Sequence, residues 1–329
     1  MVTALLDWLD SRTGYRTLLS HALDEPLPPG TGWAFTTGSV VALLIGCQLL
    51  TGVGLTMYYV PSPSLAYDSL RYLTSEVPLG ALMRGLHFWG ASFVVVAAVV
   101  HLLRVFLFGA YKAPREILWF SAVGLAWLVI QLDFTGLLLP WDVKSYWAAQ
   151  RGLEIVWSLP VVGPLLSTLV GGRSMSEDVL NRFYVLHIIV LPLMYLTFVY
   201  LTFATMRRVG LSRIAGAVPK LTTFRRHVSD LVVITLLLFA GLVTLATLMP
   251  YQFHGAADPY QTPKGTLPPW YMLAPYALYQ LPIPRWIPGL GLLAVALALP
   301  FVPALVRVAG DRLDEKRLRM VGLGVFGLW

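Results

Sequence analysis

Charge is scarce in this sequence. Asp, Glu, Lys and Arg make up 12% of its 329 residues, whereas 57% are hydrophobic, and the mean hydropathy is +0.69. Soluble globular proteins carry about 25% charged residues, so this composition excludes an ordinary soluble domain and indicates that lipid is the main solvent. The formal net charge of +7 requires no nucleic-acid partner, because basic residues beside membrane spans account for most of it.

Cysteine is nearly absent as well. The single Cys47 lies inside an apolar run, so the sequence offers no disulfide framework, no cysteine-based metal site and no C-x-x-C-H motif for covalent haem attachment. Any metal group must be held mainly by other residues. Residues 1–15 lack the successive basic and apolar regions of a removable signal. Their apolar residues interleave with aspartates, which predicts a short amphipathic helix on the membrane surface.

Long apolar runs are what the sequence has in abundance. Crossing a hydrocarbon core of about 30 Å takes about 20 helical residues, and six runs of this kind carry few charges. We expect them to span the membrane as helices at residues 33–58, 82–108, 117–139, 179–206, 231–249 and 286–308. The predicted fold is therefore an all-α polytopic membrane protein. A further apolar run at 320–329 is too short to cross and stays unassigned.

The basic residues give these helices an orientation and a division. Sixteen of the 24 Lys and Arg residues lie in segments that alternating spans place on one side, and basic loops remain cytoplasmic. This predicts a multi-pass protein of a bacterial-type inner membrane with a cytoplasmic N-terminus. The basic stretch 207–226 separates an N-terminal four-helix unit, residues 1–212, from a C-terminal unit, residues 213–329. The second unit contains a connection rich in proline and aromatic residues, 250–285, which we expect to be an ordered interfacial loop.

Three of the six histidines lie inside predicted spans, where an unbonded imidazole is costly. His101 follows His87 by 14 residues, which at about 1.5 Å per residue puts both on one helix face, about 21 Å apart. His187 lies on the fourth span at the depth of His87. A lone membrane histidine more often bridges two helices, but a level pair with a third at four-turn spacing favours a haem iron between His87 and His187. The remaining histidines are expected in surface loops: His21, His227 and His254.

The motifs around these histidines resemble one family, the cytochrome b family of quinol-oxidising bc complexes. Residues 84–87 (Arg-Gly-Leu-His) and 101–104 (His-Leu-Leu-Arg) are similar to its second helix, and 139–142 (Leu-Pro-Trp-Asp) to the loop after its third. Residues 182–187, followed by 191–193 (Leu-Pro-Leu), are similar to its fourth helix, and 258–271 to its quinol-site loop. The similarity runs from residue 32 to about 301, in one chain that joins the halves which the chloroplast-type complex splits.

The resemblance implies a haem-binding N-terminal bundle. His87 and His187 match the two ligands of an outer haem b, and His101 matches a ligand of an inner haem. Three arginines match partners of haem propionates, and three glycines match the positions through which haem edges approach the first and third helices. These residues are Arg84, Arg104 and Arg207, and Gly38, Gly52 and Gly136.

The same resemblance implies the reaction and the partners. Trp270 and Tyr271 match the catalytic quinol-site motif of the C-terminal half. The expected partners are quinone or quinol, a Rieske-type iron-sulfur protein, cytochrome c or other redox subunits, membrane lipid and a second copy of the chain.

One departure from the family pattern affects the inner haem. The fourth helix should carry a second histidine near Leu201 or Thr202, and alignment through 191–193 puts Thr202 at that position. His101 is therefore expected to be the only strong protein ligand of an inner haem, with the sixth iron position open or filled by another group. The third-helix partner of Gly38 is Ala122 instead of glycine, which makes the pocket smaller. The alternative is that no inner haem is bound.

A second departure affects the quinol-site motif. The family's Pro-Glu-Trp-Tyr here reads Pro-Pro-Trp-Tyr at 268–271, and Pro269 cannot accept the quinol proton that the glutamate takes. Another carboxylate or water must take this role, or quinol is not oxidised here in the usual way. The outer-side acids by topology are Asp133, Glu154, Glu177 and Asp258. Asp133 lies near a helix end, where solvation alone would also explain it.

Three functions remain open at this point. The resemblance implies a cytochrome b subunit of a quinol:electron-acceptor oxidoreductase, moving electrons between quinol, haem b and partner proteins. Thr202 and Pro269 favour the alternative of a cytochrome b-derived haem relay or quinone-docking anchor without a full quinone cycle. A transporter without redox activity would not explain a level histidine pair flanked by arginine and glycine. The number of haems per chain separates the three.

Overall fold

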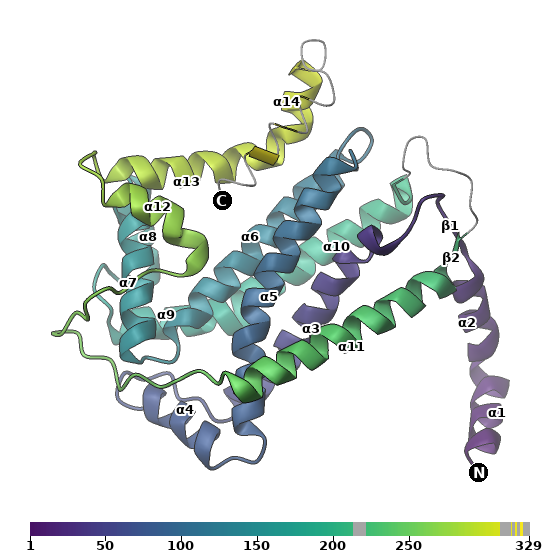
Figure 1. Ribbon diagram of the computed structural model, residues 1–329, viewed down its shortest axis with the longest axis horizontal. Coiled ribbons are helices and arrows are strands. Elements are labelled where there is room, and N and C mark those ends of the chain that lie inside the picture. The colour runs from purple at the N-terminus through teal and green to yellow at the C-terminus, as the bar shows by residue number, and fades with distance from the viewer. Residues whose placement is uncertain (213–221, 310–316, 318–319, 321–322, 325–329) are drawn as a thin grey trace.

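The computed structural model describes residues 1–212, 222–309, 317, 320, 323 and 324. Within them, six helical segments are long and apolar enough to span a membrane: Thr37–Thr56, Gly80–Leu107, Glu116–Leu138, Glu177–Val209, Phe224–Leu248 and Trp286–Val308. Figure 1 shows a structure built almost entirely of helices. The predicted all-α polytopic fold and all six predicted spans are confirmed, with ends that differ by a few residues. Helices are favoured because lipid offers no partners for backbone amides and carbonyls.

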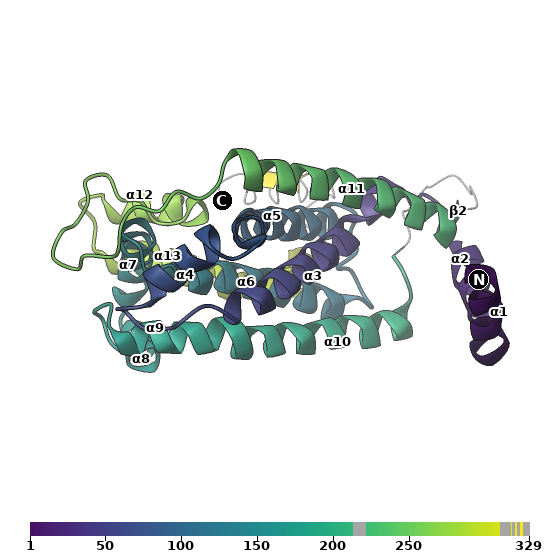
Figure 2. The same cartoon turned by 90° about the horizontal axis from the view of Figure 1, so that it is seen from below.

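Four spans form a central bundle. Helix α3 (Thr37–Thr56) packs along α5 (Gly80–Leu107), and α6 (Glu116–Leu138) packs against both α5 and α10 (Leu191–Val209). Figure 2 shows α10 along one side of this bundle and α11 (Phe224–Leu248) along the other. Large side chains such as Trp119 and Leu138 fill the centre and are fully buried. Because α11 packs on α5 and α3, the first helix after residue 212 covers the N-terminal bundle.

The fourth span contains an irregular turn at a predicted ligand. Helix α9 (Glu177–Val185) continues through a single π-helical turn, η2 (Leu186–Val190), into α10. Pro192 follows at the start of α10, where its missing amide proton removes one regular helical hydrogen bond and favours such a turn. His187 lies within η2. A π-turn holds one extra residue, so it shifts every later side chain of this span by one position relative to His187.

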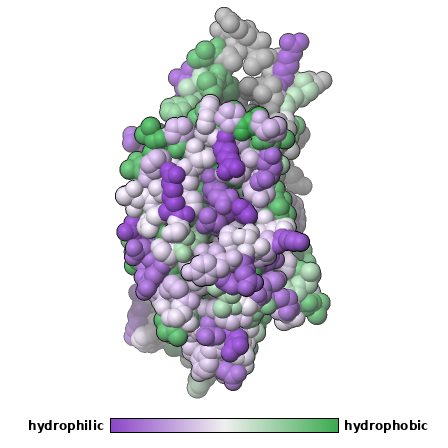
Figure 3. All heavy atoms as spheres, turned by 90° about the vertical axis from the view of Figure 1, so that its left-hand side faces the viewer, coloured by the Kyte–Doolittle hydropathy of each residue, from purple (hydrophilic) through white to green (hydrophobic). Residues whose placement is uncertain are grey.

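The connections at one end of the bundle are ordered. They contain α4 (Ala66–Ser75), α7 (Val143–Trp157), α8 (Val162–Val170), η3 (Trp270–Met272) and α12 (Leu273–Tyr279). Buried Asp142 begins α7 through a capping box with Ser145. Hydrophilic residues gather on this end of the molecule (Figure 3), as expected for a surface in water. The two predicted short helices of the third connection are present as α7 and α8, and the 250–285 connection is an ordered loop, as expected.

The other end holds the N-terminus. The predicted amphipathic segment forms α1 (Val2–Thr13), and α2 (Tyr15–Asp24) follows it. Strands β1 (Pro26–Leu27) and β2 (Thr222–Thr223) pair antiparallel, and Arg225 contacts Asp24 at 2.9 Å. The placement of two histidines in loops was wrong, because His21 lies in α2 and His227 in the first turn of α11. The helical signal was missed there because polar residues dominate both turns.

The last span bends. Helix α13 (Trp286–Ala298) and α14 (Val302–Ala309) are separated by the 3-10 turn η4 (Leu299–Phe301), and Figure 1 shows α14 turning away from α13. Pro300 and Pro303 each lack an amide donor, which accounts for the bend. The Trp119 indole donates to the Leu299 carbonyl at 2.7 Å and ties this turn to α6. The remaining turn, η1 (Trp33–Phe35), precedes α3. The run 320–329 and the unit boundary near 213 fall largely outside the described residues.

Candidate functional site

His87 of α5 and His187 of η2 face each other, with ring centroids 6.2 Å apart. An imidazole nitrogen binds a first-row metal at about 2.0 to 2.1 Å in zinc sites. The nitrogen lies about 1.1 Å from its ring centre, so two imidazoles on opposite sides of one metal have centroids about 6 Å apart. The observed separation therefore fits two ligands on either side of a haem iron.

Threonine hydroxyls fix the tautomer of both rings. Thr51 Oγ1 lies 2.9 Å from His87 Nδ1, and Thr135 Oγ1 lies 3.1 Å from His187 Nδ1. Each hydroxyl donates its own proton to a helix carbonyl, that of Cys47 at 2.7 Å and that of Gln131 at 2.8 Å. The threonine oxygens must therefore accept from Nδ1–H, which leaves the Nε2 lone pair of each histidine free to bind a metal.

Two of the predicted glycines lie against these rings. A Cβ atom at Gly52 would stand 3.2 Å from His87 Cε1, and one at Gly136 would stand 2.7 Å from His187 Cε1. Any side chain at Gly136 would displace the imidazole, and one at Gly52 would crowd it. The resemblance assigned these glycines to haem edges, and the structure shows that they also make room for the histidines. All these residues fit a haem b held between α3, α5, α6 and the fourth span.

His101 has a similar environment on one side only. Its Nδ1 lies 2.9 Å from Thr37 Oγ1, and a Cβ atom at Gly38 would stand 2.9 Å from its Cε1. On the opposite side, Thr202 donates to the Phe198 carbonyl of its own helix at 2.8 Å. The Phe198 ring lies against Gly124 of α6. The residues therefore fit one axial ligand of an inner haem.

A repeated Thr-Gly pair was the sequence signal that we missed. Thr37-Gly38 meets His101, Thr51-Gly52 meets His87, and Thr135-Gly136 meets His187. The first two pairs are 14 residues apart, the spacing of the histidines that they contact. Fourteen residues before the third pair stands Ser121-Ala122, and the buried Ser121 hydroxyl has no hydrogen-bond partner among the described residues. The fourth position thus keeps a hydroxyl but lacks both its histidine and its glycine.

The three predicted arginines lie in different surroundings. Arg84 is 8% exposed, and its guanidinium stands 3.9 Å from the Phe253 ring centre and 4.8 Å from that of Tyr251. Arg104 stacks over Phe35 at 5.1 Å, and its Nε is buried without a hydrogen-bond partner in the described part of the chain. Arg207 is exposed in the last turn of α10. Arg84 and Arg104 lie one turn from His87 and His101, where a propionate can reach them.

The two predicted quinol-site residues differ in exposure. Tyr271 is 3% exposed, whereas Trp270 is 46% exposed, and their rings meet edge to face at 5.5 Å. Burial raises the pKa of the Tyr271 hydroxyl above its usual value. The next residue, Met272, meets α7 and α6, because a Cβ atom at Gly152 would stand 2.6 Å from Phe134 Cε2 and 3.1 Å from Met272 Sδ. The loop is therefore seated on the bundle through Tyr271 and Met272.

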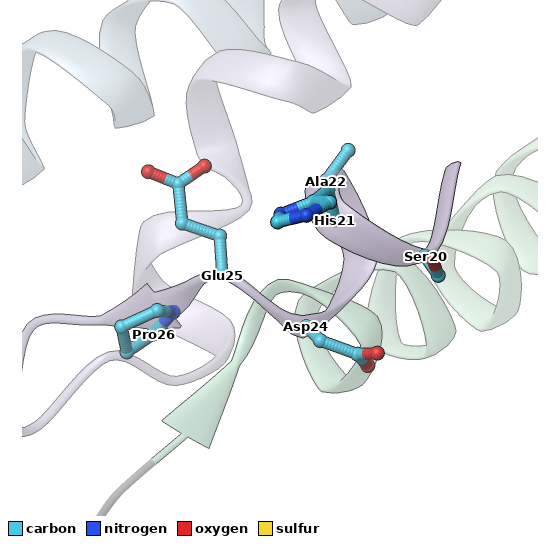
Figure 4. Close-up of a pocket in the computed structure, with 6 residues that line it drawn as sticks. All are labelled: Ser20, His21, Ala22, Asp24, Glu25 and Pro26. Carbon is cyan, nitrogen blue, oxygen red and sulfur yellow. The ribbon is translucent and has the colours of Figure 1, made fainter. Parts of the chain in front are cut away.

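A surface pocket lies at the other end of the described structure, between α2 and β1. Figure 4 shows its lining residues, Ser20, His21, Ala22, Asp24, Glu25 and Pro26. None of the predicted site residues is among them.

Comparisons with known proteins agree with this arrangement. The family model described as Cytochrome b/b6/petB matches residues 22–210, which is more than half of the chain and includes the three bundle histidines. The menaquinol:cytochrome c reductase cytochrome b subunit of Geobacillus thermodenitrificans is 38% identical over 221 residues, which is 64% of this chain and 99% of that protein. Cytochrome b6 of Heliomicrobium gestii is 38% identical over 190 residues, 57% of this chain and 89% of its own length.

The fold continues beyond the matched region. A chain in the solved structure of a hyperthermophilic respiratory Complex III superposes with a TM-score of 0.80, at 22% identity, over 98% of this chain and 95% of that one. This likeness extends the shared fold to the C-terminal half. The resemblance drawn from the histidine motifs is thereby confirmed, and the chain belongs to the cytochrome b/b6 family, whose members bind haem b.

Proposed function

We propose that this cytochrome b is the membrane subunit of a bc-type quinol:electron-acceptor oxidoreductase, in which quinol is oxidised beside an outer haem b held by His87 and His187. The observation that carries this proposal is the facing pair itself, 6.2 Å between ring centres with both Nδ1 atoms committed to threonines. The haem supplies one-electron redox chemistry, and the chain supplies ligands, polarity and access. The relatives named as menaquinol:cytochrome c reductase subunits support the reaction class.

The other assignments form part of the same proposal. His101 would hold an inner haem as its only strong protein ligand, with Arg104 and Arg207 near its propionates. Gly38, Gly52 and Gly136 would keep the pockets open, and Trp270 and Tyr271 would line the quinol site. The 1–212 unit would be the haem-binding half. A Rieske-type iron-sulfur protein, cytochrome c and a second copy of the chain are the proposed partners. The proposed location is an inner membrane with the N-terminus in the cytoplasm.

A second function is a haem relay or quinone-docking anchor without a full quinone cycle. One observation favours it: Thr202 bonds to its own helix backbone and Phe198 packs on Gly124, so the inner level lacks the second ligand. Transfer across a bilayer needs two centres. The haem count per chain in the isolated complex, with reduced-minus-oxidised spectra before and after quinol addition, separates the two functions. Two quinol-reducible haems support the first, and one haem supports the second.

Arg84→Leu is expected to lower the midpoint potential of the outer haem or its occupancy. A buried cation one turn from His87 favours the reduced, less positive iron, and each kcal/mol of lost interaction is about 40 mV for one electron. Redox titration of the haem spectrum measures the shift. Arg84→Lys keeps the charge and should retain most of the potential. An unchanged potential at full occupancy in Arg84→Leu would count against a propionate contact.

Tyr271→Ala is expected to weaken an outer-site quinol-competitive inhibitor by about tenfold, because an aromatic contact contributes about 1 kcal/mol or more beyond area burial. Inhibitor titration of quinol-dependent haem reduction measures the change. Tyr260 lies in the same connection but is 94% exposed, so Tyr260→Ala is the matched control and should leave the affinity unchanged. Equal affinities in both variants would leave Tyr271 a packing residue.

A further inference from the structure

The quinol-site loop has a carboxylate beside it that its own motif lacks. Pro269 precedes Trp270 and Tyr271 and can accept no proton. The Tyr271 side chain instead brings the loop to Asp133 of α6. The phenol hydroxyl is buried beside the Asp133 carboxylate, close enough for the two groups to interact electrostatically. It meets hydrogen-bond geometry with no described residue, so it is a buried polar group with an unused donor next to a carboxylate.

The position of Asp133 joins the loop to the haem-binding bundle. Its neighbour Phe134 packs against Gly152 of α7 together with Met272 of the loop. Three residues further along α6, Gly136 supports the His187 ring. Asp133 is thus one helical turn from the cradle of the outer haem ligand and in contact with the quinol-site loop. A quinol bound between them would have the carboxylate on one side and the outer haem site on the other.

The other acids at this end have different surroundings. Glu154 pairs with Arg151 at 3.0 Å, and Asp258 accepts the Tyr260 amide at 2.8 Å. Glu177 is exposed in the first turn of α9. Asp133 forms no salt bridge among the described residues, and its half-buried carboxylate meets only Tyr271 as a titratable side chain in that part of the chain. A carboxylate without a cation is free to take up a proton, which an ion pair is not.

We propose that Asp133 accepts a hydroxyl proton from the bound quinol in place of the acid missing at 269, and that Tyr271 positions its carboxylate. This inference rests on the quinol oxidation proposed above. In the step, the quinol O–H bond breaks, an O–H bond forms on the carboxylate, and the electron pair stays on the quinol oxygen. The electrons then leave in the oxidation itself, to the outer haem and a one-electron acceptor of a partner subunit. Asp133 releases the proton to the aqueous end.

The test uses the assembled complex in membranes, with the naphthoquinol menadiol as reductant and stopped-flow haem reduction as readout. Asp133→Asn should lower the rate of haem reduction about 100-fold, the usual range for loss of a general base. The haem spectrum and the affinity of an outer-site inhibitor should remain as in the unchanged chain. Asp133→Asn combined with Pro269→Glu should recover at least about tenfold of the lost rate, because it returns a carboxylate to the loop. Glu177→Gln is the matched control and should keep the full rate.

A second readout does not depend on turnover. Infrared difference spectra of the unchanged chain should show a protonated carboxyl band on quinol oxidation that shifts with ¹³C-labelled aspartate. If the unchanged chain does not reduce its haem with quinol, the proposed function fails. If it does, and Asp133→Asn is equally fast, loses inhibitor binding, or fails to assemble while the labelled band is missing, the role of Asp133 is overturned. A labelled band that appears in the unchanged chain supports it even where the variant cannot be assembled.

Discussion

Replacing His87 or His187 with alanine should abolish the low-spin haem b spectrum of the outer site. The two rings are 6.2 Å apart at their centres and lie on separate helices, so no neighbouring histidine of the described chain can take the place of either. A haem with one imidazole becomes high-spin or is lost. Optical and electron paramagnetic resonance spectra with haem quantification measure the loss.

Variants around the pair separate ligation from packing. Thr51→Val removes the acceptor for His87 Nδ1–H while keeping the ligand, and loss of such an outer partner typically costs about 10- to 100-fold in metal affinity. Gly136→Ala places a methyl group 2.7 Å from His187 Cε1 and should shift the haem signal without removing it. His21→Ala changes an exposed residue of α2 and should have no effect. A low-spin signal that survives both His87→Ala and His187→Ala would show that the ligand assignment is wrong.

Thr202→His should convert the inner haem into a low-spin centre. In the unchanged chain His101 is its only strong ligand, so the iron should be high-spin and should bind CO or cyanide. The π-turn at Leu186–Val190 adds one residue to the span, so position 202, 15 residues after His187, has the register that position 201 would have in a regular helix. Thr202 is therefore the position at which a new imidazole would approach the level of His101.

Side chains opposite the new histidine favour this result. Ser121 stands where Thr135 stands one level further out, and its buried hydroxyl lacks a partner in the described structure. It could accept from the new Nδ1–H as Thr135 does from His187. Ala122 replaces the glycine of that level and restricts the ring, so Thr202→His with Ala122→Gly should bind most completely. Spectra in the presence of CO measure the conversion, and His101→Ala should remove the CO-binding species. A chain with one haem and no CO-binding species would contradict the open inner site.

Much of this protein could be predicted from local pattern. The six spans follow from the length of apolar runs, because a lipid-exposed backbone must satisfy its own hydrogen bonds. His87 and His101 share a face because 14 residues are nearly four helical turns. The Thr-Gly pairs were equally visible, but their meaning depends on which histidine each one meets. The positions of His21 and His227 were wrong because short polar turns carry no apolar period.

By itself, the sequence determined the membrane class, the helices and which residue types could hold haem, because these depend on composition and on periods within one segment. The tertiary structure alone decided the pairings between segments. It placed Tyr271 beside Asp133, which precedes it by 138 residues, inserted the π-turn that sets the register of Thr202, and packed Phe198 on Gly124. Such contacts depend on how each helix is rotated against its neighbours, and that rotation is set by the side chains of all the packed elements together.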